Sequence, residues 1–309
     1  MQRRTFLKSS LVASLTSPLL RLSAAAESDP ALEKYRRTIG LQLYTLRNQM
    51  AEDERGTLQA VADAGYQQVE MMDAVTGGSI AKTARELGLD VTSAFLNFAT
   101  IVSPESDAPS EDDTLKAAEA LGLEHLVFGY VDHDHRKTAD QYKMWAGRAN
   151  DFGRRCKAAG VQLCYHNHSF EFEPLPVGPT EEKGGQGQSG ECGFEILIRE
   201  LDADLVPFEL DVFWAQLGGY DPVRTIGRLK GRLSQVHLKD LRADTPTIYD
   251  NSRVPATAFE ELGDGIVDLR ACMWAADEAG AVQCHVEQDQ SPDPVASVRK
   301  SMAWLSTAD

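Results

Sequence analysis

The feature that most constrains the fold is an alternation of short apolar runs with longer amphipathic stretches, repeated eight times between residues 38 and 305. The runs are rich in β-branched and aliphatic residues and are typical of buried strands. Parallel neighbours need a crossover helix, so this alternation predicts a parallel sheet covered by helices. The predicted strands are TIGLQLYT (38–45), YQQVEMM (66–72), DVTSAFLNF (90–98), HLVFGYV (125–131), VQLCYHNH (161–168), LVPFELDV (205–212), LSQVHLKD (233–240) and AVQCHVEQ (281–288).

Eight strand–helix units predict a closed (β/α)8 barrel, the TIM barrel, as a single domain of residues 38–305. The alternative is an open doubly wound sheet, which normally has a glycine-rich phosphate-binding turn after its first strand. This chain has YTLRNQM (44–50) at that place, so the barrel is favoured. Helices are predicted at 56–65, 79–88, 112–122, 141–160, 194–202, 221–231, 266–280 and 294–305.

The first 26 residues have the three parts of a bacterial export signal: a basic start, an apolar middle and small residues at the end. The Arg3–Arg4 pair before TFLK resembles a twin-arginine signal, which predicts export to the periplasm. The alternative is an amphipathic N-terminal helix. The apolar run is too short and too interrupted for a transmembrane helix, and residues 27–37 have the composition of a polar linker.

Charge and cysteine content narrow the choice of partner. The formal net charge of -16 repels phosphate backbones, so nucleic acid is not expected as a partner, and a small molecule is. The five cysteines include no C-x-x-C pair, and a chain of this size needs no disulfide framework.

One segment interrupts the regular pattern. Residues 174–193, PLPVGPTEEKGGQGQSGECG, are rich in Pro and Gly and have the composition of a long loop. The segment follows the fifth predicted strand, on the face where barrel enzymes carry their active sites. It is either a lid over that face or a tolerated surface insertion.

Chemically reactive side chains gather at the C-terminal ends of the predicted strands, where barrel enzymes build their sites. A mixed set of imidazoles and carboxylates without thiolates suits one divalent ion such as Mn, Mg, Co or Zn. The residues at these ends are Glu70, His166, Asn167, His168, Glu171, Glu209, Asp211, His237, Lys239, Asp240, Glu287 and Asp289.

Asp211, His237 and Glu287 are predicted metal ligands, because a buried carboxylate or imidazole at a strand end needs a partner. Strict alternation from Val161 places His166 and His168 on one face of their strand. We expect His166 to be the fourth ligand and His168 to meet the substrate. Glu171 would replace His166 as ligand if the chain turns back.

The ordered strand ends YHNHSFEF, ELDVFW, VHLKD and HVEQ resemble the xylose isomerase-like TIM barrel superfamily. The similarity is to its sugar phosphate isomerase/epimerase branch, with inosose dehydratases and ketose 3-epimerases. It implies one divalent ion held by Glu, Asp, His and Glu from strands five to eight. Asp211, His237 and Glu287 match the last three, but His166 occupies the position of the first Glu.

The resemblance implies proton abstraction next to a carbonyl through an enediolate. The candidate bases are Glu287, His168 and Glu171; Lys239 is either a base, a stabiliser of the oxyanion or the partner of Asp240 in a salt bridge. Isomerisation or epimerisation of a sugar is the first prediction. Elimination of a β-substituent from a keto-sugar or keto-glycoside, by a lyase or dehydratase, is the second.

Two other classes share this fold. A non-catalytic sugar-binding barrel would use the ion for structure only. A DNA-repair endonuclease would need more histidine ligands and a basic surface, which the acidic composition opposes.

Overall fold

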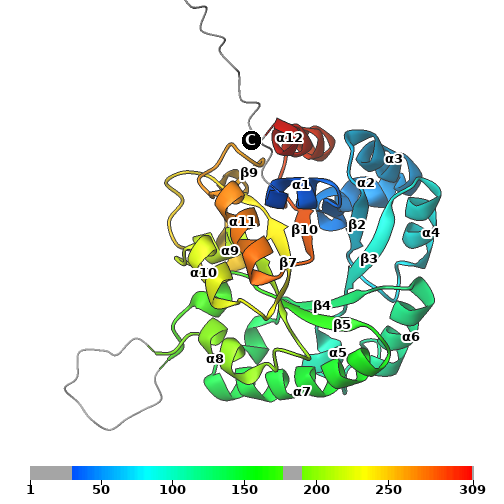
Figure 1. The fold of residues 1–309 in the computed structure, drawn as a ribbon. Coiled ribbons are helices and arrows are strands. Elements are labelled where there is room, and N and C mark those ends of the chain that lie inside the picture. Colours follow the sequence, from blue (N-terminus) through cyan, green and yellow to red (C-terminus); the bar gives the residue numbers. More distant parts are fainter. Residues whose placement is uncertain (1–29, 177–189, 308–309) are drawn as a thin grey trace, which may run out of the picture.

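The computed structural model describes residues 30–176 and 190–307. Eight parallel strands close into a barrel in the order β1-β10-β7-β6-β5-β4-β3-β2, which excludes the open sheet and confirms the predicted (β/α)8 architecture (Figure 1). The barrel strands are β1 (Gly40–Gln42), β2 (Gln68–Met71), β3 (Asp90–Phe95), β4 (His125–Gly129), β5 (Gln162–His166), β6 (Phe208–Asp211), β7 (Leu233–Leu238) and β10 (Gln283–Val286).

Helices surround the ring of strands, and each predicted helix is present (Figure 1). Eight of them correspond to the predicted stretches: α3 (Glu54–Ala64), α4 (Gly78–Glu86), α6 (Glu111–Leu121), α7 (Ala139–Ala158), α8 (Gly193–Glu200), α10 (Pro222–Arg228), α11 (Leu269–Ala279) and α12 (Pro294–Thr307). The described chain also has α1 (Pro30–Arg36), α2 (Arg47–Glu52), α5 (Ala99–Val102) and α9 (Val212–Leu217).

Local sequence signals explain where the helices begin and end. Asp221 caps α10 by accepting from the backbone of Arg224, and Pro222 occupies the first helical position. Thr138 and Gln141 form a reciprocal capping box at the start of α7. Gly280 ends α11 in the left-handed conformation, with φ of 97°, and the chain runs directly into β10.

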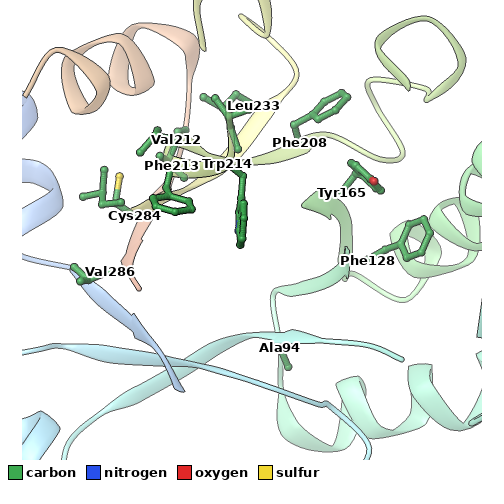
Figure 2. Close-up of a cluster of buried hydrophobic side chains, with 14 of the residues drawn as sticks. Ala94, Phe128, Tyr165, Phe208, Val212, Phe213, Trp214, Leu233, Cys284 and Val286 are labelled. Atoms are coloured by element: carbon green, nitrogen blue, oxygen red, sulfur yellow. The ribbon is translucent and has the colours of Figure 1, made fainter. Parts of the chain in front are cut away.

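The main apolar core lies between the strands and the helices. Tyr165 points outward from β5 and packs against Phe128 of β4 and Trp145 of α7, with ring centroids 5.4 and 5.5 Å apart. Figure 2 shows Tyr165 and Phe128 on neighbouring strands, while Trp214 extends toward the centre of the ring. The outward faces of the strands therefore hold the fold together and leave the inward faces for polar groups.

The structure differs from the sequence analysis in two segments. The expected linker (27–37) contains α1, whose buried Tyr35 donates its hydroxyl to the carbonyl of Ala281 at 2.9 Å. The long connection after β7 contains a small antiparallel pair, β8 (Asp240–Leu241) and β9 (Phe259–Glu260). Both were missed because the apolar pattern in each segment is too short to show a period.

Two predictions fall outside the described residues: the export signal (1–26) and most of the proposed lid, of which residues 177–189 are not described. Pro174 and Cys192 form a bridge at the base of that loop. Across the described ranges, we find no helix with the length and apolar character needed to span a membrane.

Candidate metal centre and active site

A cavity of about 400 Å³ opens at the C-terminal ends of the barrel strands. This size is sufficient for a small ligand. The cavity is lined by Gln42, Tyr44, Met72, Phe95, Tyr130, His166, His168, Trp214, Lys239, Asn251, Val254, Phe259, Glu287, Asp289 and Gln290.

The structure brings the four predicted ligands together. Ligand atoms of His166, Asp211 and His237 lie within 4.8 Å of one another, and all three residues are buried. Glu287 joins them, because its Oε2 lies 3.0 Å from Nδ1 of His237. The register explains this grouping, since Asp211 pairs with His237 across β6 and β7.

The donor set fits a divalent ion. Two imidazoles and two carboxylates are nitrogen and oxygen ligands of the kind that Zn or Mn accepts. Burial and the neighbouring His237 hold the pKa of His166 well below its usual value, so its imidazole is neutral and has a free lone pair. The residues therefore fit the ion that the sequence predicts.

Lys239 supplies a permanent positive charge at the wall of the cavity. Its ammonium lies 2.8 Å from Asp289, 2.9 Å from Glu287 and 3.5 Å from Asp211. Burial alone would lower the pKa of Lys239, but these carboxylates outweigh burial and raise it. The raised pKa favours the ammonium form of Lys239 and hence a stabilising role over that of a base, and its ion pairs in the structure are not with Asp240.

The carboxylate of Glu287 is ionised. Burial opposes its charge, but Lys239 and His237 outweigh burial and hold the pKa of Glu287 well below its usual value. An ionised carboxylate on the cavity wall is available to accept a proton, as predicted for this residue.

His166 and His168 both line the cavity, so the predicted alternation along β5 is correct. Burial and the charge of Lys239 lower the pKa of His168 to about 3, which keeps its imidazole neutral. Asn167, between the two, faces β6 and exchanges hydrogen bonds of 3.0 and 3.3 Å with the backbone of Asp211. It locks the end of β5 to the end of β6.

Glu171 does not line the cavity. The short 3₁₀ helix η3 (Phe170–Phe172) turns its side chain back to the outer side of β5, where it accepts from the Tyr165 hydroxyl at 2.5 Å. It also accepts from the backbone N–H of His168 at 2.8 Å. Glu171 is not among the cavity-lining residues of the described chain, so neither a base nor a ligand role is supported.

Two carboxylates that the sequence left without a role lie beneath the predicted ligands. Glu70 of β2 and Glu209 of β6 are fully buried, and the Oε2 of each lies within 3.3 Å of Nε2 of His237. Burial opposes the charge of Glu70, but His285 and His237 lower its pKa to about 2. The sequence could have indicated this place, because Glu70 and Glu209 stand at inward-facing positions of the alternation along β2 and β6.

Aromatic side chains form much of the remaining wall. Trp214, at the start of α9, stands 5.2 Å from the ring of His168, and Tyr130 stands 5.4 Å from it on another side. Tyr130 has a φ of 56°, a conformation that costs an L-residue energy and that tends to persist at ligand sites.

Asp240 organises the loop after β9 rather than binding the cavity ligand. Its two oxygens accept from the backbone N–H groups of Gly263, Gly265 and Val267 at 2.9 to 3.0 Å. A Cβ on Gly265 would lie 2.2 Å from Asp240 Oδ1, which explains the glycine. The ELGDGIVD stretch is therefore a turn held by a buried carboxylate.

Comparison with known proteins agrees with this architecture. A family model described as a xylose isomerase-like TIM barrel matches residues 58–308. An inosose dehydratase of Geobacillus kaustophilus is 26% identical over 261 residues, covering 75% of this chain and 79% of that enzyme. One from Lacticaseibacillus casei is 24% identical over 149 residues, or 46% of this chain and 45% of that enzyme. The chain thus spans about half the length of several curated relatives it matches.

Solved structures show the same fold. A sugar phosphate isomerase/epimerase from Parabacteroides distasonis superposes with a TM-score of 0.69 at 25% identity, covering 88% of this chain and 94% of that one. A probable 3-DHS dehydratase from Bacillus anthracis superposes with a TM-score of 0.65 at 12% identity, covering 88% of this chain and all of that one.

Proposed function

Because the chain belongs to the xylose isomerase-like TIM barrel family, we propose that it is a divalent-metal-dependent dehydratase acting on a small keto-sugar or keto-polyol. From the sequence, isomerisation or epimerisation was the first prediction and elimination the second. The arrangement of bases and the inosose dehydratase relatives favour the reverse order.

One observation carries this proposal: the end of β5 offers neutral imidazoles where a second carboxylate base would stand. Glu287 follows β10, and His166 and His168 lie three strands away around the barrel. Epimerisation at one carbon needs an acid and a base on opposite faces of that carbon. Elimination needs one base, one stabilised enolate oxygen and one donor to the departing hydroxyl, and these are the groups present.

The chain's own groups support a balanced elimination. The ionised carboxylate of Glu287 takes the proton from the carbon next to the carbonyl, and the C–H electron pair forms the enolate. The Lys239 ammonium, 2.9 Å from Glu287, stabilises the negative oxygen. The enolate then expels the β-hydroxyl, which takes the proton now on Glu287 and leaves as water, so that the carboxylate is regenerated. The product is an unsaturated ketone.

We assign His168 to orient the departing hydroxyl, as a hydrogen-bond donor that keeps its own proton. Its neutral imidazole carries one N–H, lines the cavity and is held between Tyr130 and Trp214. A divalent ion bound by His166, Asp211, His237 and Glu287 would polarise the substrate carbonyl as a Lewis acid.

The charge of the cavity favours an unphosphorylated substrate. Lys239 is the single Lys or Arg among the described residues that line it, and three carboxylates already surround its ammonium. Beyond Lys239, which the enolate oxygen would use, the described wall offers a phosphate group no Lys or Arg side chain. Aromatic faces such as Trp214 and Phe259 suit the C–H face of a ring.

The test is incubation of the purified full chain with inosose and a panel of keto-sugars in D₂O, with Mn²⁺ or with EDTA. We expect metal-dependent loss of one water. Mass spectrometry would detect this loss, and ultraviolet absorbance would detect the unsaturated ketone. Glu287→Gln should abolish the reaction, whereas Glu278→Gln, an exposed carboxylate on α11, should leave it unchanged.

Other outcomes separate the alternatives. Deuterium incorporation with inversion or carbonyl migration, and no loss of water, would establish an epimerase or isomerase instead. Binding of these compounds without exchange or turnover would establish a sugar-binding barrel.

A further inference from the structure

A second layer of buried polar groups shares His237 with the predicted metal ligands and extends beneath them. Glu70, Glu209, His237 and His285 are fully buried, and their potential ligand atoms lie within 4.8 Å of one another. They come from β2, β6, β7 and β10, so the layer crosses the interior of the barrel. Burying two carboxylates costs free energy unless each has partners. The partners of Glu70 and Glu209 should therefore indicate the role of this layer.

Glu70 fixes one side of the His237 ring. Its Oε2 lies 2.7 Å from Nε2 of His237 and also accepts from the Gln42 side-chain amide at 2.6 Å. Its Oε1 accepts from the Ser93 hydroxyl at 2.6 Å. Because an ionised carboxylate only accepts, Nε2 of His237 carries the hydrogen of this contact, and Nδ1 of the same ring faces Glu287 and the cavity.

Glu209 stands in the same relation to His166. Its Oε2 lies 3.1 Å from Nδ1 of His166 and 3.3 Å from Nε2 of His237, so one oxygen serves both rings. When Glu209 is ionised, this oxygen accepts from Nδ1 of His166. A hydrogen on Nδ1 of His166 leaves its Nε2 as the ligand atom.

We infer that Glu70 and Glu209 are positioning residues that hold the His237 and His166 rings in the tautomers with one lone pair each toward the cavity. Histidine ligands commonly donate their second N–H to a carboxylate, which orients the ring and raises its basicity. The inference rests on the proposed metal-dependent function and extends it. It also gives a physical reason for a histidine at 166: the carboxylate of Glu209 lies behind the imidazole, where it can accept the second N–H.

A competing explanation is a second cation within the lower layer. Both ring nitrogens of His285 and Oε1 of Glu209 lack hydrogen-bond partners, as ligand atoms would without their ion. However, Nε2 of His237 already faces Glu70 at hydrogen-bond distance, so a second ion would have to displace that hydrogen. The number of ions bound per chain distinguishes the two.

The test compares Zn²⁺ affinity and stoichiometry, by calorimetry with a competing chelator, for the wild type, Glu70→Ala, Glu70→Gln, Glu209→Ala and Glu209→Gln. Each Ala variant should bind one Zn²⁺ roughly 10–100-fold more weakly, the usual effect of removing such a partner. Each Gln variant keeps a carbonyl acceptor and should regain most of that affinity. Glu278→Ala is the matched control.

A spectroscopic readout separates positioning from general destabilisation. In ¹⁵N-histidine-labelled protein, the Nε2–H signal of His237 should be protected from solvent exchange with and without Zn²⁺. In Glu70→Ala it should exchange faster, because only the longer contact to Glu209 remains. Unchanged Zn²⁺ affinity in folded Glu70→Ala and Glu209→Ala, or two Zn²⁺ per wild-type chain, would overturn the inference. If the wild type binds no divalent ion, the proposed function fails, while the metal-free Nε2–H signal still decides the tautomer of His237.

Discussion

Replacing Lys239 by Met is the sharpest test of the charge balance in the site. Lys239 is 1% exposed, and its ammonium lies within 3.5 Å of the carboxylates of Asp211, Glu287 and Asp289. Methionine has a similar length and no charge. The substitution therefore leaves three carboxylates in a dry environment without their common cation.

The structure allows the size of the effect to be worked out. Breaking a buried ion pair by removing one partner costs about 3–5 kcal/mol, because the remaining charge is uncompensated. For a domain of this size each kcal/mol corresponds to about 2–4 °C in Tm. The metal-free variant should therefore melt roughly 6–20 °C below the wild type. With one more unbalanced negative charge, it should also gain more stability from Mn²⁺ than the wild type gains.

The assay is thermal unfolding followed by circular dichroism, in EDTA and in saturating Mn²⁺. Lys300→Met is the matched control, because Lys300 also contacts two carboxylates, Glu261 and Asp264, but is half-exposed at the surface. A surface ion pair is worth about 0–1 kcal/mol, so the control should shift Tm by a few degrees at most. Dehydration activity should be lost in Lys239→Met and kept in Lys300→Met.

The reasoning would be refuted if Lys239→Met in EDTA were as stable as Lys300→Met. That result would mean that the three carboxylates are not ionised together around Lys239. The second prediction is that Mn²⁺ stabilises Lys239→Met more than it stabilises the wild type. A smaller stabilisation of the variant would refute the idea that the charges of the site are balanced for a divalent ion.

Two further predictions concern buried carboxylates outside the cavity. Burial raises the pKa of Glu171 from its usual 4.5 to about 8, so the stability it contributes is complete below pH 4.5 and is lost as the pH rises through 8. Glu171→Gln should therefore gain free energy of unfolding over the wild type across that interval, up to about 4 kcal/mol by denaturant titration; parallel pH curves would contradict this. Asp240→Ala leaves several buried N–H groups unpaired and should lower the free energy of unfolding by about 2–4 kcal/mol. Substrate binding should also weaken, because β9 carries Phe259 of the cavity wall. Wild-type values of both quantities would show that the turn is stable without Asp240.

Much of the fold could be predicted because its signals are local. Each barrel strand is an apolar run followed by a helix, and Asp221 with Pro222 marks a helix start within a few residues. The short α1 and the β8–β9 pair have no such repeat. Tertiary contacts specify them instead, such as the hydrogen bond from Tyr35 to Ala281 near the other end of the chain.

The candidate site was predictable to the extent that alternation along a strand decides it. His166 and His168 share a face because side chains alternate, and both reach the cavity. Glu171 lies beyond the end of β5, where alternation no longer applies and the 3₁₀ turn reverses its direction. The contact of Glu70 with His237 joins β2 and β7, which are far apart in sequence and separated in the barrel by β1 and β10, and no local pattern contains such a contact.

The contact between Glu209 and His166 also constrains how this site could be exchanged for that of a two-carboxylate epimerase. In this structure, Nδ1 of His166 lies 3.1 Å from Oε2 of Glu209. Placing glutamate at 166 alone would bring two carboxylates close together there, and they would repel each other. Removing Glu209 first would leave His166 without its acceptor. The two positions are thus coupled, and a designer who exchanges these active sites should first place a neutral acceptor such as glutamine at 209 and then replace the histidine.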